Sequence, residues 1–240
     1  MPKIEFIAKD QETFDHIKDC FPYPSKKNIP TWFKTTPKFL SEEPKVDKFG
    51  DPNTTIRNCM PFLDLMTAGY HLPLPCDVSI KTDKSGKTFI YWSNGNISLF
   101  SEHDYRRNTT IPSDLEYDIV RFKIVNPWIV KTEKDYSCIF QSPYMHELPF
   151  EAISAIVDTD KHPIPVNIPI KIKKNFNGVI PKGTPFVQII PFKREEWNSS
   201  ISVDDGSSNS IWNNVVLNFI FDRYKKFFRS KKVFKCPFHK

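Results

Sequence analysis

Glycine is scarce in this sequence, and its scarcity argues against folds that bind phosphates on glycine-rich loops. Only 7 of the 240 residues are glycine. Neither G-x-G-x-x-G nor G-x-x-x-x-G-K-[ST] occurs, so we expect neither a Rossmann dinucleotide site nor a P-loop. Proline, in contrast, occurs 21 times, and it is excluded from helix interiors and central strands. The chain therefore predicts many short elements joined by rigid turns, and it disfavours a helical bundle.

Paired cysteines and long apolar runs are also missing. The five cysteines include no C-x-x-C pair, which disfavours both a disulfide framework and a structural zinc site. We expect free thiols in a reducing cytosol. The apolar runs fall short of the roughly 18–20 residues that a membrane helix needs, so we expect no membrane span. The first residues lack the apolar region of a secretory leader, and none is expected.

Positive charge is concentrated at one end of the chain. The net charge is +6, and eight Lys or Arg residues with no acidic residue lie between Arg223 and Lys240. Nucleic-acid binding is therefore not expected outside this basic tail. Apolar residues at helical spacing over 210–229 predict an amphipathic helix with a basic end. Two alternatives stay open: the helix docks on the core or on a neighbouring subunit, or it binds a membrane surface or nucleic acid.

The middle of the chain predicts a mainly-β core domain over residues 60–192. Short β-rich runs are separated there by turn signals, as in a sandwich, a barrel or a related fold. These runs are 77–81, 88–92, 97–100, 120–125, 128–131, 137–140, 153–157, 166–172 and 186–192. Residues 1–59 predict an irregular arm rich in proline and aromatic residues, with one short helix over 11–20 capped by Asp10. Residues 193–209 predict a linker, and residues 210–240 the C-terminal helix and tail.

Four segments of the predicted core carry most of the functional information. They are Thr67–Leu72, Tyr136–Pro143, Ala155–Asp160 and Ile180–Ile190. In this order and spacing they resemble the first four motifs of the trimeric dUTPase and dCTP-deaminase superfamily, which has the β-clip fold. Ser142 precedes Asp158 by 16 residues, and Asp158 precedes Gln188 by 30, much as in that superfamily. The whole chain also resembles an uncharacterised family common in phages.

The resemblance implies a nucleotide hydrolase or a nucleotide-binding protein that is a homotrimer, with Mg²⁺ as a cofactor and sites between subunits. It implies that Asp158 is the base that activates water, and that Ser142 and Gln188 face the phosphates. It also implies a location in the host cytoplasm or in the virion. The candidate set on motif positions is catalytic Asp158 and His71, and substrate-binding Tyr70, Gln141, Ser142, Asp160 and Gln188.

The chain also departs from these motifs. His71 stands where the superfamily has Asp, and an imidazole does not suit a hard cation. Gln141 stands where it has Arg, so a permanent charge for phosphate is missing. The glycine-rich fifth motif has no counterpart. The alternative is therefore a non-enzymatic trimeric module, for example a virion component.

Local alternatives stay open for the acidic residues. Asp158 and Asp160 equally fit a turn-capping pair at the end of a strand. Together with His162 they also form D-x-D-x-H, whose alternate residues share one face of an extended strand and could bind a metal. His146 and His103 lie elsewhere in the sequence as further imidazole ligands.

Overall fold

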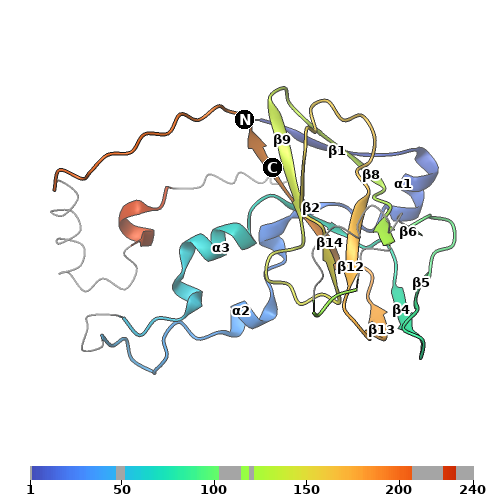
Figure 1. The fold of residues 1–240 in the computed structure, drawn as a ribbon, viewed down its shortest axis with the longest axis horizontal. Helices are drawn as coiled ribbons and strands as arrows, with labels where there is room; N and C mark the ends of the chain where they lie inside the picture. Colours follow the sequence, from blue (N-terminus) through green and yellow to red (C-terminus); the bar gives the residue numbers. More distant parts are fainter. Residues whose placement is uncertain (1, 47–51, 103–114, 119–121, 207–223, 231–240) are drawn as a thin grey trace. The chain divides into compact units, whose positions relative to one another are not determined.

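The computed structural model describes residues 2–46, 52–102, 115–118, 122–206 and 224–230. The chain divides into two compact units. The first, here called the β unit, comprises Met1–Asn28 and Met66–Glu196; the second comprises Ile29–Leu65 and Trp197–Lys240. Antiparallel strands dominate the β unit, so the predicted mainly-β class is confirmed (Figure 1).

A five-stranded antiparallel sheet forms the centre of the β unit. Its order is β11 (Ala155–Val157), β9 (Tyr136–Gln141), β14 (Pro185–Lys193), β3 (Tyr70–Pro73) and β2 (Tyr23–Pro24). β14 lies at the centre of this sheet, because β3 and β9 pair with its two edges. Its first five residues are all buried. A strand buried on both faces accounts for the nearly continuous apolar run that predicted it.

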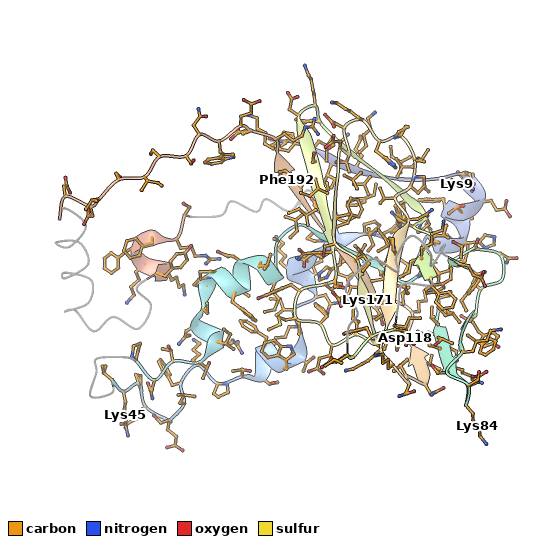
Figure 2. The ribbon with its side chains drawn as sticks, in the orientation of Figure 1. Lys9, Lys45, Lys84, Asp118, Lys171 and Phe192 are labelled. Atoms are coloured by element: carbon orange, nitrogen blue, oxygen red, sulfur yellow. The ribbon has the colours of Figure 1, made fainter. Side chains whose placement is uncertain are left out.

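Three smaller sheets complete the unit. The four-stranded sheet is β10 (Phe150–Ala152), β12 (Ile168–Ile172), β7 (Phe122–Ile124) and β6 (Phe100–Glu102). The others are β13 (Gly178–Ile180), β4 (Val78–Thr82) and β5 (Thr88–Trp92), and the pair β1 (Ile4–Ala8) and β8 (Trp128–Thr132). Lys171, labelled in Figure 2, is opposite Glu151 in the ladder, and its Nζ lies 2.8 Å from that carboxylate.

Short β-rich runs between turn signals correctly predicted several of these strands, and one of them also shows the expected alternation. Ile168, Ile170 and Ile172 of β12 are buried, while the residues between them are partly exposed. This is the period of two expected for a strand with one face on the core. The strands absent from the predicted set are β1, β2, β3, β10 and β13, which have five residues or fewer. Four of them have four residues or fewer and do not stand out as β-rich runs.

The N-terminal segment differs from the irregular arm that was predicted. β1 pairs antiparallel with β8, with Ile4 opposite Thr132, and Phe6 lies edge-to-face on Tyr70 at 5.3 Å between ring centroids. The predicted short helix is present as α1 (Gln11–Ile17), three residues shorter at its C-terminus. Its cap is as predicted, since Asp10 Oδ1 accepts a hydrogen bond of 2.7 Å from Thr13 N. A 3₁₀ turn, η1 (Ser25–Lys27), follows β2.

The second unit contains α2 (Thr31–Thr35), η2 (Ile56–Asn58), α3 (Met60–Met66) and one π-helical turn, η4 (Tyr224–Phe228). The Arg57 guanidinium donates to the carbonyl oxygens of Phe33 and Thr36 at 3.0 and 3.3 Å, and also to that of Lys34. It thereby satisfies carbonyls that the end of α2 leaves without partners. Apart from η4, the predicted helix over 210–229 lies outside the described residues, and so does the tail beyond 230.

Within the described ranges, every helix is too short or too polar to cross a lipid bilayer.

Gly69 gives a test of the central sheet. It precedes β3 with φ +65°, and a Cβ there would lie 1.9 Å from Ile189 O. We expect Gly69→Ala to lose clearly more than the roughly 1–2 kcal/mol that a left-handed conformation costs an L-residue. Gly86→Ala is the matched control, because Gly86 has φ +81° but no atom within 4 Å of the place that a Cβ would take. Urea denaturation measures both losses, and equal losses would show that the close approach to Ile189 is unimportant.

Candidate functional site

A row of four polar side chains crosses the five-stranded sheet. Tyr23 on β2 is opposite His71 on β3, His71 is opposite Gln188 on β14, and Gln188 is opposite Gln141 on β9. These four residues are here called the polar row. His71 and Gln188 are completely buried. The register thus brings together His71, Gln141 and Gln188, three residues that the sequence motifs selected.

Gln188 makes its hydrogen bonds inside the protein. Its Nε2 donates to Ala68 O at 2.8 Å, and its Oε1 accepts from Tyr144 N at 3.0 Å. Gln141 Nε2 also donates to this oxygen, at 3.4 Å. The amide therefore connects the turn before β3 with the loop after β9. A buried amide that is satisfied in this way stabilises one arrangement of the strands.

His71 lies between two other rings. Its ring centroid is 5.8 Å from that of Tyr23 and 5.2 Å from that of His146, and both contacts are edge-to-face. Neither ring nitrogen of His71 has a hydrogen-bond partner among the described residues. Burial, together with the neighbouring His146, lowers the pKa of His71 from 6.5 to about 3. The imidazole is therefore neutral at physiological pH and cannot act as a general acid there.

His146, like Tyr23, is a residue of this site that the motifs did not select. It lies in the loop between β9 and β10, and its Nε2 is buried with no partner in the described part of the chain. Burial lowers its pKa, although a hydrogen bond with the Asn28 backbone opposes the shift. A histidine in a loop carries no periodic signal, so only the tertiary structure places it against His71.

Asp158 and Asp160 lie at a different place. Asp158 directly follows β11, next to Ser137 near the start of β9, and Ser137 Oγ donates to its Oδ1 at 2.6 Å. Gln141 is at the other end of β9, four residues away, which corresponds to roughly 13 Å of strand. Within one chain, therefore, the structure does not bring the two aspartates to the polar row.

Arg194 pairs with both aspartates. It forms a two-point contact with Asp160, including Nη1 to Oδ1 at 2.9 Å, and its Nη1 lies 3.3 Å from Asp158 Oδ1. Hydrogen bonding to Arg194 lowers the pKa of Asp160 to about 2. The backbone N–H of Asp135 donates to the same carboxylate at 2.9 Å. Asp160 thus serves a structural contact, whereas the Asp158 side chain is 53% exposed.

The other two candidate residues also have structural contacts. Ser142 Oγ accepts a hydrogen bond of 2.7 Å from Ala152 N on β10, so its hydroxyl joins two strands. Tyr70 precedes His71 on β3, and adjacent side chains of a strand point to opposite faces. Its ring packs on Phe6 of β1.

An open cavity of about 510 Å³ lies beside Asp160. Four lysines and three acidic residues contribute to its lining, which consists of Lys3, Glu5, Lys131, Thr132, Glu133, Lys134, Asp160 and Lys161. Lys3 pairs with Glu5, and Asp160 with Arg194. Lys131, Lys134 and Lys161 outnumber the remaining acidic residue, Glu133, and give this cavity an excess of positive charge.

The polar row does not fit Mg²⁺, the cofactor that the resemblance implies. Mg²⁺ takes oxygen ligands and retains water, whereas His71 offers only imidazole nitrogen in an enclosed position. In the ranges that the structure describes, no three or more His, Cys, Asp or Glu side chains gather closely enough to hold a metal ion. The D-x-D-x-H alternative gains no support from the contacts of Asp160 with Arg194 and of His162 Nδ1 with Ile164 O.

Comparison with protein-family models, with curated proteins and with solved structures finds no match for this chain.

The burial of His71 predicts a loss of stability in mild acid. A histidine whose pKa falls on folding binds a proton in the unfolded chain first, so stability is full above about pH 6.5 and decreases as the pH falls toward 3. At about 1.4 kcal/mol per pH unit, the loss between pH 7.5 and pH 5 is about 2 kcal/mol. Urea denaturation in EDTA-containing buffer at the two pH values measures it.

A variant assigns this effect to His71. We expect His71→Gln to have a clearly smaller pH dependence, with the remainder due to His146, whose pKa also falls. His16→Gln on α1 is the control and should behave like the wild type. An unchanged pH dependence in His71→Gln would contradict the assignment.

Proposed function

We propose that this protein is a non-enzymatic β-clip-like module that assembles with copies of itself, for example as a component of a virion. The observation that carries the proposal is that the polar side chains at most motif positions either bond within the protein or are enclosed by it. Gln188 and Ser142 bond to backbone groups of neighbouring segments, and His71 is enclosed. A ligand site instead presents a few polar groups toward an open pocket.

The separation of Asp158 from the polar row means that a hydrolase would have to combine residues of two copies, as the resemblance implies for sites between subunits. A general base must lie within hydrogen-bond reach of the proton that it removes. Asp158 and Gln141 are separated by the length of β9, so one chain does not assemble a base with the other motif residues. Within this chain, the candidate base Asp158 is thus apart from Gln188, the candidate phosphate contact in the polar row.

The edge of the five-stranded sheet supports self-association. Within the described residues, β11 is one of the two edge strands of this sheet, opposite β2, and Ile156 at its centre is 66% exposed. Ile164, a few residues later, is 60% exposed. An apolar edge strand is a template for pairing with another chain, and proteins commonly protect such edges. In the homotrimer that the resemblance implies, β11 forms one of the two surfaces that a closed ring needs.

A second candidate function is nucleotide binding, or hydrolysis by a diverged enzyme. The observation that favours it is the cavity beside Asp160, where Lys131, Lys134 and Lys161 could contact a polyphosphate. Asp158, whose carboxylate is exposed, directly follows β11 and precedes Asp160 by two residues. A nucleotide site here would use the lysines rather than the polar row.

Self-association is tested at β11. We expect light scattering to show a trimer for the wild type, and Ile156→Lys to dissociate it, because a charge would be buried at the edge of the sheet. Tyr91→Lys is the matched control, since Tyr91 is 56% exposed on the separate strand β5. A monomeric wild type, or an Ile156→Lys variant that stays assembled, would contradict the proposal. Circular dichroism checks that both variants fold.

Nucleotide binding is tested by thermal shift. We expect no stabilisation by nucleoside mono-, di- or triphosphates, with or without Mg²⁺ or Mn²⁺. A ligand at 100 times its dissociation constant stabilises a protein by about 2.7 kcal/mol, so the method would detect a site. A shift that is lost in Lys134→Glu would instead support the second candidate function. Nucleotide turnover that is abolished in Asp158→Asn would support the hydrolase.

A further inference from the structure

The buried His71 of the polar row contacts the half-buried His146 edge-to-face, and neither histidine has all its ring nitrogens satisfied within the described residues. The His71 and His146 ring centroids are 5.2 Å apart, and the ring planes are at 89°. Both nitrogens of His71 and Nε2 of His146 lack a partner among the described residues. A buried polar atom without a hydrogen bond costs about 1–3 kcal/mol. Such atoms therefore point to a water molecule or a ligand that completes the site.

A third polar group lies on the same part of the sheet. Ser25 N donates to Gly69 O at 3.0 Å, which places Ser25 beside the residues that lead into His71. Its hydroxyl is buried and has no partner within the described ranges. The unpartnered atoms of Ser25, His71 and His146 therefore belong to three neighbouring segments, which are η1, β3 and the loop after β9.

We propose that His71 and His146 bind one transition-metal ion, with Zn²⁺ as the first candidate. Neutral imidazole is a common ligand for Zn²⁺, Co²⁺, Ni²⁺ and Cu²⁺. With metal–nitrogen distances of about 2.0–2.1 Å, two imidazoles on a tetrahedral ion have ring centroids roughly 5 Å apart. The observed separation of 5.2 Å agrees with this geometry. The remaining positions are filled by water or by an oxygen such as the Ser25 hydroxyl.

The loop that carries His146 is also strained next to the site. Met145 has φ +60°, a left-handed conformation that costs an L-residue about 1–2 kcal/mol. His146 N donates to Pro143 O at 3.1 Å and closes the turn. Residues in such conformations are concentrated at ligand sites and at active sites. The strained turn holds the His146 ring against His71, and a bound metal would offset its cost.

Metal titration of the full chain tests this inference, which does not depend on self-association. The protein is stripped with a chelator and titrated with Co²⁺, whose visible spectrum reports tetrahedral coordination, and with Zn²⁺ by calorimetry. We expect one ion per chain. We expect His146→Phe to weaken binding by about 100-fold or more, since even loss of an outer-shell partner costs 10–100-fold. Phe keeps a ring of similar size against His71.

The control is His162→Asn, because His162 lies outside the polar row and its Nδ1 contacts Ile164 O at 2.8 Å. It should bind metal like the wild type. His71→Asn should lose binding as His146→Phe does, and if it fails to fold, the His146→Phe result decides alone. Absence of binding to the folded wild type, or unchanged binding in His146→Phe, would overturn the proposal. The unpartnered nitrogens would then contact internal water.

Discussion

The amide of Gln188 connects three segments that are far apart in the sequence. It bonds to Ala68 before β3, to Tyr144 after β9, and to Gln141 on the neighbouring strand. Because the amide is completely buried, each of these bonds replaces one that water would otherwise provide. A change in the register of β14 would leave a donor and an acceptor unsatisfied in the sheet centre. The position of His71, and with it the contact to His146, depends on this register.

The sequence motifs anticipated part of this arrangement. The resemblance to the superfamily motifs placed His71, Gln141 and Gln188 in one candidate set, and the ladders put them on adjacent strands. Tyr23 and His146 could not be found in this way. β2 has only two residues, and His146 lies in a loop, so neither has a period or a motif. Their places follow from long-range pairing, which a local pattern does not encode.

Prediction of the strands from the sequence had the same limit, because local patterns do not encode long-range pairing. The run over Thr88–Trp92 was predicted with its observed ends, because it is bounded by clear turn signals. β1 was assigned to an irregular arm, although Ile4 and Phe6 pack against the core. The difference arises because β1 pairs with β8, more than a hundred residues later, and its own sequence gives no indication of that partner. Likewise, no motif includes Arg194, which sets the conformation of Asp158 and Asp160.

The imidazole at position 71, where the resembled motif has a carboxylate, determines what this position can bind. A carboxylate buried here would carry a charge, and a buried charge requires a cation or several hydrogen bonds to offset its desolvation. The neutral His71 ring instead packs between Tyr23 and His146 and can be completely enclosed. The same position is then unsuited to a hard cation and to proton transfer near neutral pH, but suited to a nitrogen-binding metal. The ligands that position 71 can accept therefore differ from those that a carboxylate would accept.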